Sequence, residues 1–458
     1  MADRYSDRWR VLALMVQILL LTLMTSAKRT ENCDTFPALD NPHKVDVHCN
    51  CMQRLFHTNL SISQLTINQT SCFEKGLELN WPDLETMVAP DTLLLVGAQV
   101  FFANNIVANW NSSISRLSFF DSTFDLLPAH VFKGMKLLKQ IRIFGGSVGI
   151  IKSNAFSNLD QLQLVEIANT SISMIESHAF SNLSSLEDLA IVYTSVGTIE
   201  TEAVSLNRET TEEINCADIR VSASNSKNVI DVIRRQITST ANVSLPEFGT
   251  RLYLFKNNIQ SLKTRALATH TLGFLIVGGN HFENVESLAF SMELYNGCEI
   301  SAALFIGNTI TNLQRHALRG LTGSDGVPYQ TFIALSNNKF HKVEEQGFRL
   351  NKNVIIYSAD ENHFDCTCDA LDWLQSNNDS QEEQELEKEL VLKAICLDGT
   401  NLVSFATACT DHGTDTKITP DTHPPVPPTQ SSGVSGHIQS TFSATFSILT
   451  LVISRSLI

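Results

Sequence analysis

Apolar positions recur at a fixed interval through the second quarter of the chain. Phe132, Phe156 and Phe180 are spaced 24 residues apart, and the pentapeptide AFSNL occurs at both 155–159 and 179–183. We call a set of positions spaced 24 residues apart a column. Five further columns are apolar in four successive repeats, and their first residues are Ile114, Leu117, Phe119, Phe124 and Leu127. A period of this length, kept over several copies, predicts a solenoid whose coils stack to share one core.

Each repeat contains one segment with the alternation of a strand. In the segment Leu164–Ala168, Val165 and Ile167 fall on one face and Glu166 falls on the other. The remaining apolar positions recur too irregularly for a strand and predict a turn and a short helical return. The fold class expected is therefore α/β, a solenoid with a curved parallel sheet and about 10 repeats of 24 residues between 89 and 364.

The C-terminal half keeps this pattern with looser spacing. The residue order L-x-L-x-x-N returns at 252–257, 275–280, 303–308 and 333–338, with apolar substitutes at some positions. Extra residues before Ile333 predict a loop on one face. Residues 205–250 do not fit the period, and they hold either one or two degenerate repeats or an inserted loop.

The N-terminus has the parts of a secretory signal peptide. Three arginines precede an apolar run from Val11 to Leu23, and Thr25, Ser26 and Ala27 follow it. The prediction is a signal peptide over 1–27, with an uncleaved anchor helix as the alternative.

The C-terminus has the parts of a glycosylphosphatidylinositol anchor signal. Residues 411–432 are rich in Thr and Pro and predict an extended stalk. Small residues at Ser431, Ser432 and Gly433 are followed by a polar spacer and an apolar tail, which predicts an anchor propeptide over 433–458. Arg455 interrupts this tail, so a secreted unstructured end and a short membrane span stay open as alternatives.

Cysteines and glycosylation sequons agree with export. The ten cysteines are Cys33, Cys49, Cys51 and Cys72, then Cys216 and Cys298, then Cys366, Cys368, Cys396 and Cys409. Groups of four at each end predict disulfide staples rather than zinc sites, because an exported chain is oxidised. The seven predicted N-glycosylation sites are Asn59, Asn68, Asn111, Asn169, Asn182, Asn242 and Asn378.

The repeat order L-x-x-L-x-L-x-x-[small]-x-I-x-x-I resembles the extracellular leucine-rich-repeat family. The segment ENHFDCTCDALDWLQ at 361–375 looks like the cysteine-rich cap of that family. The resemblance implies that Cys366 pairs with Cys396 and Cys368 with Cys409, in a cap over 365–410. Residues 28–88 look like the matching N-terminal cap, whose pairing stays open, as does the state of Cys216 and Cys298.

The same resemblance gives the asparagine column a role. In this family an Asn side chain bonds backbone groups of the neighbouring repeat. Here Asn257, Asn280, Asn308, Asn338 and Asn362 supply it. The N-terminal half has Ala98, Ser122, Gly146, Thr170 and Thr194 instead, so we predict that this half is the softer one.

The chain also resembles an arthropod group typified by the non-catalytic subunit of the shrimp (Oplophorus) luciferin 2-monooxygenase. The residues that carry the resemblance are a C-x-C near the N-terminal cap, AF-x-x-L repeats and C-x-C-D, followed by Cys396, Asp398, Gly399, Thr400 and Cys409. This resemblance implies a repeat protein without chemistry of its own.

One motif is typical of hydrolases. Gly145–Gly149 fits G-x-S-x-G with Ser147 as the nucleophile, but Val148 occupies an inward repeat column, which favours a turn. Glutamates at 176, 200, 286 and 344 fall one residue past the last apolar column and indicate solvated turns. We therefore expect no enzyme, no cofactor and no metal, and a net charge of −15 argues against a nucleic-acid partner.

The concave face of the predicted sheet is the candidate binding site. Side chains between the inward positions point out from it, and exposed apolar groups there mark an interaction surface. The residues predicted to bind a partner are Phe120, Arg142, Phe144, Glu166, Val192, Tyr193, Tyr253, Phe255 and Ile276. A glycan on Asn169 would lie at the rim of this face.

These features predict a glycosylated protein held by a lipid anchor on the outer leaflet of the plasma membrane, which recognises an extracellular protein or mediates adhesion. The alternatives are a secreted, non-catalytic partner subunit of an enzyme and a matrix protein. The oligomeric state, homomeric or heteromeric, stays open.

Overall fold

The computed structural model describes residues 33–38, 45–50, 62–68, 76–79, 91–102, 114–206, 250–294, 301–323, 331–351, 355–368, 390 and 392–411. The chain divides into two compact units, Met1–Asp411 and His412–Ile458, and all described residues belong to the first. The predicted signal peptide, the stalk beyond Asp411 and the anchor residues Ser431, Ser432 and Gly433 lie outside the described residues.

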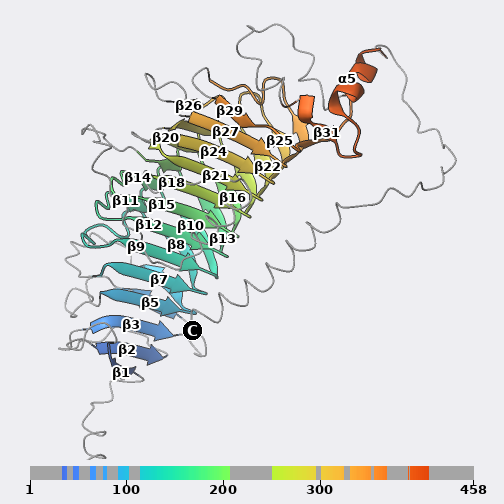
Figure 1. The fold of residues 1–458 in the computed structure, drawn as a ribbon. Helices are drawn as coiled ribbons and strands as arrows, with labels where there is room; N and C mark the ends of the chain where they lie inside the picture. The colour runs from blue at the N-terminus through green and yellow to red at the C-terminus, as the bar shows by residue number, and fades with distance from the viewer. Residues whose placement is uncertain are drawn as a thin grey trace, which may run out of the picture. The chain divides into compact units, whose positions relative to one another are not determined.

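Three sheets run along the first unit, and their strands follow one another in chain order (Figure 1). Sheet A has 13 strands: β1 (Cys33–Pro37), β2 (Val45–Asn50), β3 (Ile62–Asn68), β5 (Thr92–Val96), β7 (Arg116–Phe120), β9 (Gln140–Phe144), β12 (Leu164–Ala168), β15 (Asp188–Val192), β18 (Arg251–Phe255), β21 (Phe274–Gly278), β24 (Ser301–Ile306), β27 (Thr331–Ser336) and β29 (Ile355–Ser358).

Sheets B and C are built from the later parts of the same coils. Sheet B has 12 strands: β4 (Gly76–Leu79), β6 (Gln99–Phe102), β8 (Thr123–Leu127), β10 (Ser147–Ile151), β13 (Ser171–Ile175), β16 (Ser195–Ile199), β19 (Asn258–Leu262), β22 (His281–Val285), β25 (Thr309–Leu313), β28 (Lys339–Val343), β30 (His363–Phe364) and β31 (Ile395–Cys396). Sheet C has six: β11 (Phe156–Ser157), β14 (Phe180–Ser181), β17 (Val204–Ser205), β20 (Leu267–Leu272), β23 (Phe290–Leu294) and β26 (Leu321–Gly323).

The register confirms the predicted solenoid. Val165 of β12 lies opposite Ile141 on one side and Leu189 on the other, each 24 residues away. Neighbouring strands are parallel in all three sheets, except for the antiparallel pair β1–β2 at the N-terminal end. Each chain segment therefore makes its backbone hydrogen bonds to the coil before and the coil after it.

The return segments are strands and turns rather than the short helices that the spacing predicted. Phe156 of sheet C donates its backbone N–H to Ala179 of the next coil at 2.9 Å, and Phe180 donates to Ala203 at 3.0 Å. These hydrogen bonds run between coils, so they replace the bonds within a segment that a helix would need. Among the described residues, α5 (Leu402–Asp411) is a helix at the C-terminal end.

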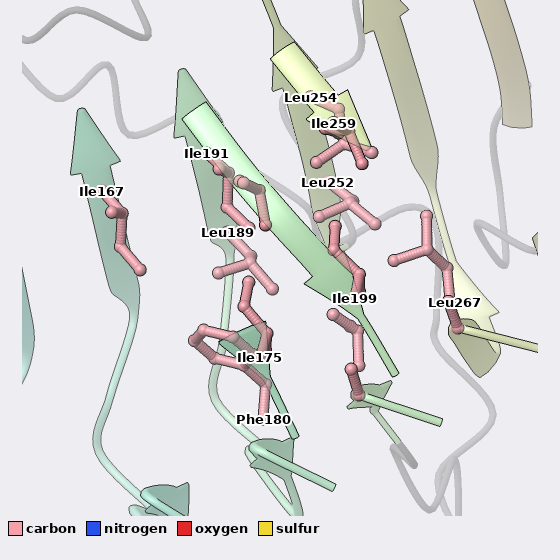
Figure 2. Packing of buried hydrophobic residues seen from close by; sticks show 14 of the residues in the cluster. Ile167, Ile175, Phe180, Leu189, Ile191, Ile199, Leu252, Leu254, Ile259 and Leu267 are labelled. Carbon is pink, nitrogen blue, oxygen red and sulfur yellow. The ribbon is translucent and has the colours of Figure 1, made fainter. Parts of the chain in front are cut away.

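The interior is filled by the columns that repeat in the sequence. Figure 2 shows Ile167, Leu189 and Ile191 from sheet A beside Ile175 and Ile199 from sheet B, with Phe180 from sheet C. Phenylalanine rings stack from coil to coil, with centroids 5.3 Å apart for Phe132–Phe156 and 4.7 Å apart for Phe156–Phe180. Burial of one such large apolar side chain stabilises the fold by about 1.5–3 kcal/mol.

The asparagine column forms the ladder that the family resemblance implied. Asn308 donates from Nδ2 to the carbonyl oxygen of Val277 in the preceding coil at 2.8 Å, and its Oδ1 accepts from the backbone N–H of Asn280 at 3.0 Å. The pattern repeats through the C-terminal coils, at Asn257, Asn280, Asn338 and Asn362. Every rung joins two coils through buried side-chain hydrogen bonds.

The described N-terminal coils have no asparagine at this position, although the Thr170 hydroxyl donates to the carbonyl oxygen of Gly145 in the preceding coil at 3.3 Å. Ser122 and Thr194 donate to the carbonyl oxygen two residues earlier in their own coil, at 3.0 and 2.9 Å. At Gly146 a Cβ atom would lie 2.0 Å from the carbonyl oxygen of Ser122, so glycine permits this close approach of the backbones. Here the corner is held by backbone contacts such as Ser147 N to Ser122 O, at 3.1 Å.

The irregular segment in the middle of the chain does not add a coil to the stack. Leu189 of β15 pairs directly with Leu252 of β18, although the two residues are 63 positions apart in the sequence. The same holds for β16 with β19 in sheet B and β17 with β20 in sheet C. Of the two sequence interpretations, degenerate repeats or an insertion, the pairing supports an insertion between adjacent coils.

Cysteines occur at both ends of the stack. Cys366 is bonded to Cys396, the pair that the family resemblance implied, and this bond ties β31 to the segment after β30. Cys33 lies opposite Cys49 in the β1–β2 pair. Cys49 takes part in a disulfide, and Cys368 takes part in another one. Cys409 belongs to α5, whereas Cys51, Cys72, Cys216 and Cys298 lie outside the described residues.

Candidate functional site

The candidate site is the outer face of sheet A, defined as the face that points away from the core. In β7, Leu117 and Phe119 point into the core, and Arg116, Ser118 and Phe120 point outward. In β9, Ile141 and Ile143 point inward, and Gln140, Arg142 and Phe144 point outward. The strands are five residues long, so each presents three outward positions, in register with its neighbours.

Nine residues were predicted to form an exposed binding strip on this face, and the structure divides them into two groups. Phe120, Arg142, Phe144, Tyr193 and Phe255 are half-buried. The expectation of exposure is wrong for the other four, because Glu166, Val192, Tyr253 and Ile276 are buried.

Val192, Tyr253 and Ile276 belong to a second apolar cluster, formed by outward side chains from β12 to β27, and Glu166 lies on β12 between two of its members. Its described members all lie on strands of sheet A or directly after them, and they surround Tyr253, which is 0% exposed. Adjacent apolar groups of this number are removed from water in a folded chain, since their exposure is unfavourable. We call this part, from β12 to β27, the covered part of the outer face.

Two ion pairs lie on the same face, and sequence reasoning missed the stronger one. Arg251 binds Asp188 with both its Nε and Nη2 atoms, at 2.6 and 3.0 Å, and both side chains are largely buried. Asp188 and Arg251 are 63 residues apart, so the 24-residue period does not predict that they pair, although each is the first residue of its strand. The second pair joins Arg142 Nε to Glu166 Oε2 at 3.2 Å. The bidentate contact of Arg251 with Asp188 fixes the geometry of both side chains.

The outward side chains of β5, β7 and β9 keep access to water. Leu94, Val96 and Ser118 are half-buried, like Phe120 and Phe144, and Arg116 is exposed. The rings of Phe120 and Phe144 lie 5.8 Å apart between centroids and form a tilted pair. We call this surface the open part of the outer face.

A second aromatic group lies at the corner where sheet A strands end. Tyr193 and Phe255 meet edge to face at 6.2 Å, and the Lys256 ammonium lies 5.8 Å from the Tyr193 ring centroid. Burial raises the pKa of Tyr193 to about 12, and burial lowers the pKa of Lys256. The Lys256 ammonium is placed for a cation–π contact with the Tyr193 ring.

Among the predicted glycosylation sites, Asn169 and Asn182 are exposed at turns with positive φ, 51° and 52°. Asn169 follows β12 at the rim of the outer face, where a glycan would face water. Asn68 ends β3, and the other predicted sites, Asn59, Asn111, Asn242 and Asn378, lie outside the described residues.

The hydrolase motif does not have its expected surroundings. Ser147 is the first residue of β10, in register with Thr123 and Ser171, and Gly145 and Gly146 make the turn from sheet A to sheet B. A nucleophile elbow needs a strand followed by a helix, and here a strand follows a strand.

Three of the four predicted turn glutamates, Glu176, Glu286 and Glu344, bind the preceding coil. Glu176 accepts from Lys152 at 2.7 Å and from the backbone N–H of Ser153 at 3.0 Å. Glu286 accepts from Lys263 and Thr264 in the same way. In the parts of the chain that the structure describes, no three His, Cys, Asp or Glu side chains are grouped to hold a metal, and no helix is long and apolar enough to cross a membrane.

Comparison with known proteins agrees with the repeat pattern. Residues 107–222, about a quarter of the chain, match the BspA-type leucine-rich-repeat region in six copies. With the register above, this match defines the described array as a leucine-rich-repeat solenoid. No curated protein matches the chain, and nothing in the comparisons supports the resemblance to the luciferin monooxygenase subunit.

Two solved structures illustrate the similarity. One is the plant peptide hormone receptor RGFR1 in complex with RGF2, at 11% identity and a TM-score of 0.24, over 69% of this chain and 64% of that chain. Another is the Toll–Spätzle complex of Drosophila, at 12% identity and a TM-score of 0.20, over 81% of this chain and 58% of that chain. This chain therefore spans less than two thirds of either, and scores this low say nothing about its ligand.

Proposed function

We propose that this protein is a recognition module that binds an extracellular protein ligand through the open part of the outer face of sheet A. The observation that carries the proposal is the half-buried Phe120–Phe144 pair on two adjacent strands, beside Leu94 and Val96. Aromatic side chains at the centre of a surface contribute most of the binding energy in many interfaces. Parallel backbone hydrogen bonds hold these strands rigidly, so little conformational entropy is lost on binding.

The test compares two aspartate substitutions in neighbouring coils. The purified secreted protein is bound to intact cells and crosslinked, and the captured surface proteins are compared between variants. Phe144→Asp is expected to lose a partner that Leu126→Asp retains, because Leu126 is exposed on β8 of sheet B. Both variants are first checked for an unchanged thermal unfolding midpoint. Equal capture by the wild type and Phe144→Asp would overturn the proposal.

The same proposal includes attachment to the cell surface. Support comes from the signal-like N-terminus, the Thr/Pro segment and the small residues Ser431, Ser432 and Gly433 before an apolar tail. A phosphatidylinositol-specific phospholipase is expected to release the protein from intact cells. Protein found only in the medium of untreated cells would instead favour a secreted partner of an enzyme.

A further inference from the structure

The segment that contains β7 and the start of β9 has a charge opposite to that of the whole chain. The chain has 33 basic and 48 acidic residues, with a net charge of −15. The segment 114–142, which contains β7 and the start of β9, reverses this ratio with five basic side chains (Arg116, Lys133, Lys136, Lys139, Arg142) and two acidic ones (Asp121, Asp125). A local field of this kind attracts an anionic group.

Two of these cations, Arg116 and Lys139, lie where β7 and β9 begin. Arg116, the first residue of β7, lies opposite Gln140 in the register, so Lys139 reaches the sheet beside it. The backbone N–H of Lys139 donates to Ser115 at 2.8 Å, which fixes this position. Arg142 follows on the same face as Gln140, and adjacent strands are only about 4.8 Å apart. Arg116 and Lys139 are exposed.

Two acidic residues lie near this group. Asp91 directly precedes β5, and its backbone carbonyl accepts from the backbone N–H of Arg116 at 3.1 Å. Glu166 binds Arg142 at 3.2 Å and its side chain is 7% exposed, so this charge is paired within the face. Asp121 is exposed, but it lies at the far end of β7, beyond Phe120. Arg116 and Lys139 therefore present positive charge to solvent at the start of the strands.

The aromatic pair lies at the other end of the same strands. Phe120 is four residues after Arg116 in β7, which corresponds to about 13 Å along a strand. An extended peptide covers that distance in four residues, so one peptide can contact both ends of the face.

We propose that the open part of the outer face binds an extended acidic segment of its protein ligand. An Asp or Glu of that segment pairs with Arg116 and Lys139, and an apolar side chain three or four residues away packs on Phe120 and Phe144. This inference rests on the proposed function and specifies the chemistry of the ligand.

The probe is an unbiased display library of ten-residue peptides, selected on the full-length protein. Enriched peptides are expected to carry an acidic residue and, three or four positions away, an aromatic or aliphatic one. Synthetic copies should bind at least about tenfold more weakly to Arg116→Glu/Lys139→Glu and to Phe144→Asp. Raising the salt concentration should weaken binding as well, since exposed ion pairs are screened.

The control is Lys342→Glu, which reverses one positive charge at an exposed position of β28 in sheet B and should leave binding unchanged. If the double charge reversal lowers the unfolding midpoint, Arg116→Gln/Lys139→Gln replaces it. Peptides enriched without acidic residues, or equal losses in Lys342→Glu, would refute the inference. A sulfated polysaccharide that binds independently of Phe144 would do so too.

The two proposals fail separately. A cell-surface partner that needs Phe144 but is indifferent to charge reversal at Arg116 and Lys139 would sustain the proposed function and reject the acidic segment. A partner insensitive to Phe144→Asp would reject both.

Discussion

At the residue scale, one corner position in each coil requires left-handed backbone. Gly97, Gly145, Gly279 and Gly307 occupy it with φ of 62–74°, and glycine adopts this conformation without steric cost. Tyr193 and Lys256 occupy it with φ of 53° each, which costs an L residue about 1–2 kcal/mol. Their backbone N–H groups donate to Phe255 and Gly278 of the next coil, both at 2.8 Å, and these bonds hold the strained corner.

The buried asparagine rungs yield a stability prediction. Asn308→Ala should lower the free energy of unfolding by roughly 2–4 kcal/mol, because it removes the bonds to Val277 and Asn280 and leaves buried polar groups unpaired. Urea denaturation followed by circular dichroism measures the change.

Asn258→Ala is the matched control, since Asn258 is exposed at the first position of β19. A loss at Asn308 no larger than at Asn258 would show that the ladder contributes little to stability.

The asparagine positions could be predicted from the sequence, but the burial of individual outward residues could not. An asparagine recurs at the same place after two inward apolar residues in successive repeats, and Asn308 is one example. This regular position predicts that its side chain is buried at the turn between coils. Val192 and Tyr253 also occupy a regular outward column, and period two assigns their face correctly. Alternation distinguishes the two faces of a strand, but it carries no information on whether the second face is covered.

At the element scale, the turns after sheet B strands are tied to the preceding coil by carboxylates. The hydrogen bond and charge of Lys152 and the bonds from Ser153 outweigh burial and lower the pKa of Glu176. Burial alone would raise the pKa of Glu286, but the bonds from Lys263 and Thr264 outweigh it, so the net shift is downward. A carboxyl group with a lowered pKa stabilises the fold while it is ionised.

These carboxylates predict a small loss of stability in acid. Their contribution is complete above the unfolded-state pKa and disappears as the pH falls through the lower folded-state pKa. The double variant Glu176→Gln/Glu286→Gln should thus be less stable than the wild type at about pH 6 and equal to it at about pH 2. Urea denaturation at both pH values measures this difference.

The size of the effect is limited to less than about 1 kcal/mol per site, since Lys152 and Lys263 are more than a third exposed and solvent screens them. Glu345→Gln, at an exposed position, is the control. A difference that persists unchanged at low pH would contradict the ionic explanation.

The sheet A strands were predictable at this scale, whereas sheet C was not. Five alternating residues in each repeat suffice to recognise a strand such as β12. The strands β11 and β14 have only two residues each, too few for any periodicity. These residues are strands because they pair with the next coil. In the sequence, a short helix and a two-residue strand would both show only one phenylalanine per repeat, so the pattern cannot distinguish them.

At the scale of the whole molecule, the two halves differ in how their coils are joined. At the position of the asparagine column, coils up to β16 have backbone bonds and hydroxyls bonded mainly within their own coil, whereas later coils have asparagine bonds between coils. We therefore expect backbone amides of β7–β13 to exchange hydrogen at least about tenfold faster than those of β21–β27.

Hydrogen exchange followed by mass spectrometry on the folded protein measures this contrast. Asn280→Ala/Asn308→Ala provides the control, because it should bring exchange in β21 and β24 toward that of the N-terminal coils. Equal protection in both halves of the wild type would show that the backbone ladder alone sets coil stability.

The array was recognisable from sequence as far as its period stayed regular. Between Arg116 and Asp188 the register follows the 24-residue spacing without exception, and each neighbour could be named in advance. Beyond Leu206 the interval changes, and the partner of Asp188 became apparent only through its ion pair with Arg251. Stacking constrains which residues meet across coils, but it does not constrain how much chain lies between them.

The direct contact between β15 and β18 has a consequence for the length of this chain. Thr250, directly before β18, donates its side-chain hydroxyl to the carbonyl oxygen of Leu186 in the preceding coil at 2.9 Å. Two coils in direct contact can therefore be much further apart in the sequence than one period, and dividing total residues by the period overcounts the coils.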